Sequence, residues 1–288
     1  MTMLRRRSRQ GGAGSYAGIA ATVLATSALT ASEAPPAPDD ATAELAGILE
    51  GLEATFVLYD RSRDRFVRHD QDRARARFSP CSTFKIPNSL IALETGVVDG
   101  PDTPKKWEPE KHPCDAEQQG EARCNTLSRD HTLRSALENS VVWYYREVAI
   151  AVGEPAMRRY LAAFDYGNRD MSSGLDGFWL SASLKISADE QIVFLQKLYD
   201  GKLGSPRNTA VVKDILVVEE TEAFRLSAKT GMGRTPGGRP LGWWVGWVER
   251  GDDVHFFAFN LEADSFDVIV EHRVPKAREA LAAVGLLD

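Results

Sequence analysis

The sequence predicts an α+β fold in which helices flank one antiparallel sheet and a further helical lobe is inserted. Residues 55–59 and 65–68 are rich in β-branched and aromatic side chains and are separated by a polar turn, as in two paired strands. Residues 223–229, 242–249 and 254–260 form three more such runs, divided by turns rich in Gly, Pro and Asp. Helical patterns dominate between the two groups. Strands near both ends of the chain, with helices between them, indicate one sheet with an inserted lobe.

The N-terminus has the pattern of a secretory signal peptide. Arg5, Arg6, Arg7 and Arg9 form a positive region, and a modestly apolar stretch follows. Small residues then lead to a plausible cleavage site after Ala34. We therefore expect residues 1–34 to be a signal peptide, 35–50 a linker and N-terminal segment, and 51–288 the folded domain. The alternative is a leader with no export role, because Thr and Ser dilute the apolar run.

The central helices are predicted from their capping residues and apolar spacing. Residues 82–95 read as one helix that ends at a glycine, although Pro87 lies inside it. Pro155 is placed as a first-turn proline, and residues 187–190 form a capping box before another apolar helix. Residues 275–284 are predicted to form the closing helix.

Composition and charge exclude several kinds of partner and site. The chain has a formal net charge of −6, whereas nucleic-acid binding requires a clustered basic surface. No apolar run after the leader reaches the roughly 20 residues that cross a bilayer, so no membrane contact is expected once the leader is removed. The five histidines lack metal-ligand spacing, and we expect no metal site.

One tetrapeptide suggests the chemistry. Ser82-Thr-Phe-Lys85 is the only S-x-x-K in the chain, and residues three apart share one face of a helix. A serine hydroxyl becomes a good nucleophile when a neighbouring base removes its proton, and the Lys85 amine is placed to do so. Two further motifs follow in order, Ser140-Val-Val142 and Lys229-Thr-Gly231. S-x-x-K with a later K-T-G is typical of serine enzymes that open β-lactams or remodel cell-wall peptides.

The combined motifs resemble those of the class D (oxacillinase-type) serine β-lactamases, from about Phe56 to the C-terminus. The segments that carry the resemblance are 82–85, 140–142, 166–168 (Tyr-Gly-Asn), 229–231 and 243–248 (Trp-Trp-Val-Gly-Trp-Val). Class A enzymes carry S-D-N at the second motif, and this chain has no S-D-N. The resemblance implies the β-lactamase/transpeptidase-like fold, with the active site in the groove between the sheet and the helical lobe.

The same resemblance implies catalytic roles. Ser82 would form the acyl-enzyme, and Lys85 would be the general base after carbon dioxide converts it to N6-carboxylysine, with no other cofactor. Ser140 would pass a proton between Lys85 and the leaving lactam nitrogen. Val142 would line the lysine pocket, and the indole N–H of Trp179 would hold the carbamate. Taken one at a time, these residues also fit ordinary roles as helix caps or core side chains.

Further positions are implied to bind substrate: Lys229, Thr230, Gly231 and Arg273. The lysine, the threonine and the arginine would meet the substrate carboxylate, for which a guanidinium fork is well shaped. Gly231 would let the substrate approach the backbone closely. The backbone N–H groups of Ser82 and Met232 would form the oxyanion hole.

The three cysteines fit an exported protein. Cys114 and Cys124 flank a polar loop that a disulfide would close, and the alternative is two free thiols. Cys81 remains unpaired beside the nucleophile and is expected to be a small packed residue.

The leading hypothesis is a periplasmic or secreted enzyme that hydrolyses small-molecule β-lactams of the penicillin type and confers antibiotic resistance. The alternatives are a β-lactam sensor domain, which is stably acylated, and a penicillin-binding transpeptidase, which deacylates slowly. The sequence leaves open the accepted β-lactams, the export route and the oligomeric state.

Overall fold

The computed structural model describes residues 38–287, excluding the side chains of residues 38–41 and of Gln118 and Gln119. Its centre is a six-stranded sheet with the order β2-β1-β6-β5-β4-β3, in which every neighbouring pair is antiparallel. The strands are β1 (Glu53–Asp60), β2 (Arg65–His69), β3 (Val217–Glu220), β4 (Arg225–Arg234), β5 (Pro240–Arg250) and β6 (Asp253–Glu262). The predicted fold class and the five predicted strands are therefore confirmed.

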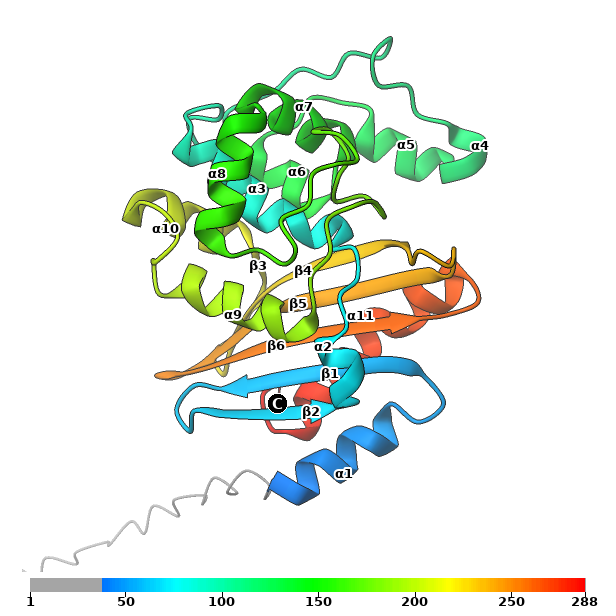
Figure 1. Cartoon of the computed structure of the whole chain (residues 1–288), viewed down its shortest axis with the longest axis vertical. Helices are drawn as coiled ribbons and strands as arrows, with labels where there is room; N and C mark the ends of the chain where they lie inside the picture. Colours follow the sequence, from blue (N-terminus) through cyan, green and yellow to red (C-terminus); the bar gives the residue numbers. More distant parts are fainter. Residues whose placement is uncertain (1–37, 288) are drawn as a thin grey trace, which may run out of the picture. The chain divides into compact units, whose positions relative to one another are not determined.

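Each face of the sheet covers a separate hydrophobic core, because successive side chains of a strand point to opposite faces. On β5, Trp243 and Trp247 lie in the core shared with the helical lobe, whereas Trp244 lies in the opposite core. The opposite face is covered by α1 (Pro38–Ile48) and α11 (Phe266–Ala283). The lobe lies at the β4 side of the sheet, as Figure 1 shows.

The lobe and its connections contain the remaining helices. They are α2 (Gln71–Arg75), the 3₁₀ turn η1 (Cys81–Phe84), α3 (Lys85–Glu94), α4 (Ala116–Gln119), α5 (Glu121–Leu127), α6 (Leu133–Glu138), α7 (Val142–Val152), α8 (Glu154–Phe164), α9 (Ala188–Tyr199) and α10 (Pro206–Ile215). The predicted caps are confirmed: α8 has proline in its first turn, and Ser187 and Glu190 form the capping box of α9.

The segment predicted as one helix over 82–95 is two elements, and this difference positions the site. Cys81, the first residue of η1, has φ +51°, a left-handed conformation that an α-helix does not contain. The α-helix begins only at Lys85. Pro87 is its third residue, a position whose N–H has no partner within an α-helix. The proline therefore does not disrupt α3.

Two other boundaries differ from the prediction. The closing helix begins at Phe266 rather than Pro275, because Ser265 caps it and Ile269 is fully buried against the sheet. Pro275 is tolerated inside it. The expected linker 35–50 contains α1, and Leu45 in this helix and Leu49 just after it are buried. The four-residue strand β3 was missed, since it is short and only half buried. The predicted signal peptide lies outside the described residues.

Candidate active site

Ser82 and Lys85 meet at the junction of η1 and α3. The Nζ atom of Lys85 lies 2.7 Å from the Oγ atom of Ser82. Lys85 has no exposed surface, while Ser82 remains partly exposed. The serine hydroxyl is thus reachable from solvent, with a buried amine as its neighbour. This is the arrangement that an activated serine nucleophile requires.

The environment of Lys85 disfavours its charged form. Burial lowers the pKa of Lys85 well below its usual value, and the charge of Lys229 lowers it further. The centre of the Tyr145 ring lies 5.5 Å from Nζ, and no carboxylate among the described residues pairs with this amine. A neutral lysine amine can accept a proton, which an ammonium cannot do.

Trp179 supplies a buried donor without an acceptor. Its ring stacks on Phe84, the residue before Lys85, with ring centres 5.3 Å apart. The side chain is fully buried, and its indole N–H has no hydrogen-bond partner among the described residues. Leaving such a donor unpaired costs about 1–3 kcal/mol. A hydrogen-bond acceptor placed beside the indole N–H of Trp179 would remove this destabilisation.

The second motif lies in the strained turn between α6 and α7. Ser140 has φ +56°, a conformation that non-glycine residues rarely adopt outside functional sites. Its N–H donates to the Leu137 carbonyl, and the Val141 N–H donates to the Ala136 carbonyl. Val142 is 37% exposed, which is unusual for valine and consistent with lining an open groove.

The third motif places a second buried lysine on β4. Lys229 is only 5% exposed, and its Nζ atom donates to the Thr230 carbonyl (3.2 Å) and hydroxyl (3.4 Å). Burial lowers its pKa to about 7, and the charges of Arg273 and Arg123 act in the same direction. A cation with these neighbours and no carboxylate partner in the described chain is poised to bind an anion.

Arg273 reaches the same strand from α11. Its Nη1 donates to the Gly231 carbonyl at 2.9 Å, and its buried Nε has no partner among the described residues. The side chain therefore lies beside the K-T-G motif and has an unused donor. This placement depends on the early start of α11.

Gly231 is required by a close backbone approach that the sequence did not reveal. A Cβ atom there would lie 3.0 Å from the Pro80 carbonyl oxygen and 3.2 Å from Cγ2 of Thr83. The glycine thus lets β4 pack directly against η1, which carries the nucleophile. The prediction had assigned this space to the substrate.

The free edge of β4 points its amides into the groove. The Ala228 N–H donates to Leu216 on the β3 side, and β3 pairs with β4 no further along than Ser227. Backbone groups of an edge strand alternate in direction, so the amides of Thr230 and Met232 point to this same side without a strand to receive them. Met232 is 43% exposed. Its N–H is thus available as an oxyanion donor.

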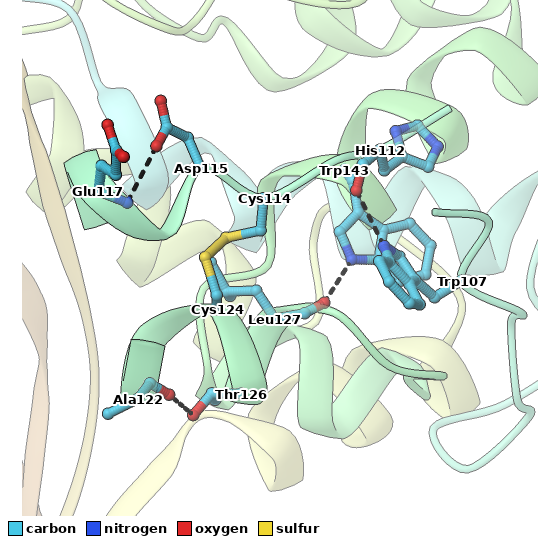
Figure 2. Close-up of a disulfide and its surroundings, with 10 residues drawn as sticks. All are labelled: Trp107, His112, Cys114, Asp115, Glu117, Ala122, Cys124, Thr126, Leu127 and Trp143. Carbon is cyan, nitrogen blue, oxygen red and sulfur yellow. Dashed lines mark hydrogen bonds between the residues drawn. A yellow bond between two sulfur atoms is a disulfide. The ribbon is translucent and has the colours of Figure 1, made fainter. Parts of the chain in front are cut away.

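A disulfide holds the segment beside the second motif (Figure 2). Cys114 and Cys124 are bonded, whereas Cys81 is free and buried. After Cys124, the Leu127 carbonyl accepts from Nε1 of Trp143 at 2.8 Å. Trp143 directly follows Val142. The disulfide segment is thereby fixed to the start of α7, one residue beyond the second motif.

Arg123 is a site residue that the sequence did not identify. It lies on α5 next to Cys124, and its charge lowers the pKa values of both Lys85 and Lys229. The side chain is exposed and has no ion pair among the described residues. A single arginine in a polar segment has no pattern that would reveal this placement.

Two kinds of site are not found in the described part of the chain. Residues 38–287 contain no group of three His, Cys, Asp or Glu side chains arranged to hold a metal ion. In the same residues, no helix has both the length and the apolar character needed to cross a membrane.

Comparison with known proteins finds a matching family model and several related enzymes. The family model of the penicillin-binding-protein transpeptidase domain matches residues 54–278. β-Lactamase OXA-48 of Klebsiella pneumoniae is 42% identical over 217 residues, which cover 75% of this chain and 77% of the relative. β-Lactamase OXA-10 of Pseudomonas aeruginosa is 40% identical over 220 residues, with 75% and 79% covered.

Solved structures agree with these relatives. The class D β-lactamase FUS-1 (OXA-85) of Fusobacterium nucleatum subsp. polymorphum superposes with a TM-score of 0.77 at 35% identity, covering 85% of this chain and 98% of that one. The class D β-lactamase YbXI of Nostoc gives a TM-score of 0.76 at 32% identity, with 87% and 99% covered.

Proposed function

The chain belongs to the class D serine β-lactamases, hydrolases of the β-lactam amide bond, and we propose that it hydrolyses penicillin-type antibiotics through an acyl-enzyme on Ser82. The observation that carries this proposal is the 2.7 Å contact between Ser82 and a buried Lys85, whose pKa burial lowers well below its usual value. Hydrolysis of these antibiotics confers resistance on the host.

Acylation needs a base and an oxyanion hole. The Ser82 hydroxyl loses its proton toward Lys85 and attacks the lactam carbonyl, while the amides of Ser82 and Met232 stabilise the negative oxygen. Ser140, held in its strained turn, returns the proton to the lactam nitrogen as the C–N bond breaks. The ring opens and the acyl group remains on Ser82 until water releases it.

Lys85 is proposed to act as N6-carboxylysine. A neutral amine is the form that adds carbon dioxide, and burial favours that form because it lowers the pKa of Lys85 well below its usual value. The unpaired indole N–H of Trp179 fits an acceptor placed in this pocket. The carbamate would supply a carboxylate-like base, and no Asp or Glu side chain among the described residues is bonded to Ser82 or Lys85.

The substrate carboxylate is proposed to bind Lys229, Thr230 and Arg273. These residues give an ammonium, a hydroxyl and an unused guanidinium N–H around the free edge of β4. Lys229 and Arg273 repel each other in the free enzyme, and a bound carboxylate would attract both of them.

Turnover distinguishes a hydrolase from a sensor or a slow transpeptidase. The wild type is mixed with an excess of a chromogenic cephalosporin and of benzylpenicillin, and product is counted per enzyme. A hydrolase continues, while the alternatives stop after about one equivalent. Ser82→Ala should abolish turnover, and mass spectrometry should locate the penicillin adduct on the peptide that contains Ser82. An adduct elsewhere would reject the assignment.

Export is proposed from the leader and the disulfide. A disulfide persists in an oxidising compartment, such as the periplasm or the exterior of the cell. The intact mass of protein recovered from the periplasmic fraction should correspond to a chain lacking residues 1–34. Full-length chain confined to the cytoplasm would reject this proposal.

A further inference from the structure

One buried hydroxyl joins the segment that carries the nucleophile to the loop that carries Trp179. The Oγ atom of Ser79 donates to the Trp179 carbonyl at 2.8 Å and accepts from the Ser181 N–H at 3.0 Å. Ser79 is 1% exposed, so both hydrogen bonds lie in the protein interior. The hydroxyl therefore holds the loop backbone on both sides of Leu180.

The loop backbone is strained next to Trp179. Ser181 has φ +55°, a conformation that non-glycine residues keep only where the surrounding contacts hold it. Its N–H donates to Ser79, and its own Oγ accepts from the N–H of Arg234, the last residue of β4, at 2.8 Å. Ser181 is thus fixed from two sides, and Ser79 provides one of them.

Ser79 is itself anchored, and it belongs to the same segment as the nucleophile. Its carbonyl accepts from Nε1 of Trp243 on β5 at 2.9 Å. The next carbonyl, that of Pro80, accepts from the N–H of Thr83 at 3.1 Å and from its hydroxyl at 2.8 Å. Ser82 lies within this hydrogen-bonded turn. The loop of Trp179 is therefore positioned relative to the nucleophile by a short, buried connection.

Ring contacts alone position the indole of Trp179 less closely than a hydrogen bond requires. The indole stacks on Phe84 with ring centres 5.3 Å apart and meets Phe178 edge to face at 5.1 Å. Aromatic pairs are favourable over separations of about 4.5–7 Å. A hydrogen bond needs its heavy atoms within about 3.2 Å. The buried, unpartnered indole N–H therefore needs a further contact that fixes the backbone of Trp179.

We propose that Ser79 is a positioning residue for the carbamate of Lys85, because its hydroxyl holds the Trp179 backbone where the indole N–H can donate to a carbamate oxygen. The inference rests on the proposed function, since it requires N6-carboxylysine at Lys85. The Ser79 hydroxyl bonds to Trp179 and Ser181, so it acts through the loop and not on the reacting atoms. Loss of this hydroxyl should displace the indole donor and favour loss of carbon dioxide from the lysine.

The test measures how much bicarbonate is needed to carboxylate Lys85. Enzyme freed of carbon dioxide is titrated with carbon-13-labelled bicarbonate at fixed pH, and the carbamate NMR signal and benzylpenicillin hydrolysis are both recorded. Ser79→Ala should raise the half-saturating bicarbonate concentration in both measurements by about two- to tenfold, as expected for the net loss of one hydrogen bond. Activity at saturating bicarbonate should return to near the wild-type value.

A double-mutant cycle shows whether Ser79 acts through the indole. Trp179→Phe removes the donor itself, so Ser79→Ala should add little to the half-saturating concentration in that background, whereas independent effects would multiply. If Ser79→Ala does not fold, Ser79→Cys supplies the same comparison, because a thiol is a weaker donor and acceptor than a hydroxyl.

Ser187→Ala is the matched control for stability. Ser187 is 3% exposed, and its Oγ accepts from the Glu190 N–H at 3.1 Å. Its loss should lower the free energy of unfolding without changing the bicarbonate requirement.

Two outcomes would overturn the role of Ser79 and leave the carbamate intact. One is an unchanged bicarbonate requirement in Ser79→Ala. The other is the same increase with and without the indole of Trp179. A wild type with full activity and no carbamate signal in buffer free of carbon dioxide would instead reject the carbamate, and this inference with it.

Discussion

The Nζ atom of Lys85 lies 2.7 Å from the Oγ atom of Ser82, across the junction between a 3₁₀ turn and an α-helix. This contact joins a solvent-accessible hydroxyl to an amine whose pKa burial lowers well below its usual value. The two residues are three apart in sequence, and the left-handed residue Cys81 starts the turn that presents Ser82.

Removing the Lys85 amine should abolish catalysis. Lys85→Met keeps an unbranched side chain of similar length but cannot accept a proton. We expect kcat/KM for benzylpenicillin to fall by about 10²–10⁴, the usual contribution of a general base. Lys106→Met, at an exposed lysine, should retain full activity. Activity of Lys85→Met within tenfold of wild type would exclude Lys85 as the base.

The carbamate should make activity depend on carbon dioxide and on acid. The carbamate forms from the neutral amine and is lost when the nitrogen is protonated, so low pH should inactivate the enzyme reversibly and bicarbonate should restore it. Trp179→Phe removes the indole donor and should raise the bicarbonate concentration needed. Carbon-13 NMR with labelled bicarbonate should give a carbamate signal that is absent in Lys85→Met. Full activity in degassed buffer without such a signal would mean that Lys85 acts as a free amine.

Substrate capture should weaken above neutral pH because Lys229 titrates there. In the free enzyme its pKa is about 7, so its ammonium is charged below that pH and loses its charge as the pH rises. The pH profile of kcat/KM, which reports the free enzyme, should therefore decline through about pH 7 on its alkaline side. Lys229→Arg keeps a charge throughout and should remove this decline. A decline that persists in Lys229→Arg must come from another group.

Arg123 should tune the same titration from the disulfide segment. Its positive charge lowers the pKa of Lys229, so Arg123→Gln should move the alkaline decline of kcat/KM to higher pH. Arg129→Gln removes an exposed arginine that does not act on Lys229 and serves as the matched control. An identical shift in both variants would indicate only a change of net charge.

Gly231→Ala should disturb the nucleophile through packing. The new methyl group would lie 3.0 Å from the Pro80 carbonyl oxygen and 3.1 Å from Cβ of Trp243, so η1 must move. We expect a loss of about 1–3 kcal/mol in the free energy of unfolding, as for other overpacked sites, together with at least a roughly tenfold lower kcat. Gly237→Ala, whose methyl group would lie 3.8 Å from Oγ1 of Thr235, should be neutral in both denaturant melts and kinetics.

The disulfide should contribute measurably to stability. Closing a loop with a sequence separation of 10 stabilises a fold by about 2–3 kcal/mol in the chain-entropy model. Cys114→Ser with Cys124→Ser should therefore lower Tm by roughly 5–10 °C. The denatured, unreduced chain should titrate one thiol, and three after reduction. Three thiols before reduction would show that the bond does not form.

The sequence alone determined the fold class, five of the six strands and the order of the three motifs, because these depend on local patterns. Alternation of apolar residues specifies strands, and the S-x-x-K spacing places an amine beside a hydroxyl on one helical turn. The sequence also predicted the capping box at Ser187, because all of its hydrogen bonds lie within four consecutive residues.

Tertiary structure decided what depends on contacts between distant segments. Ile269 packs against the sheet and extends α11 back to Phe266, which places Arg273 beside Gly231. Burial in the folded protein, rather than any motif, lowers the pKa of Lys85. Burial and electrostatic coupling depend on the distances between packed elements, and a local sequence pattern contains no such distances.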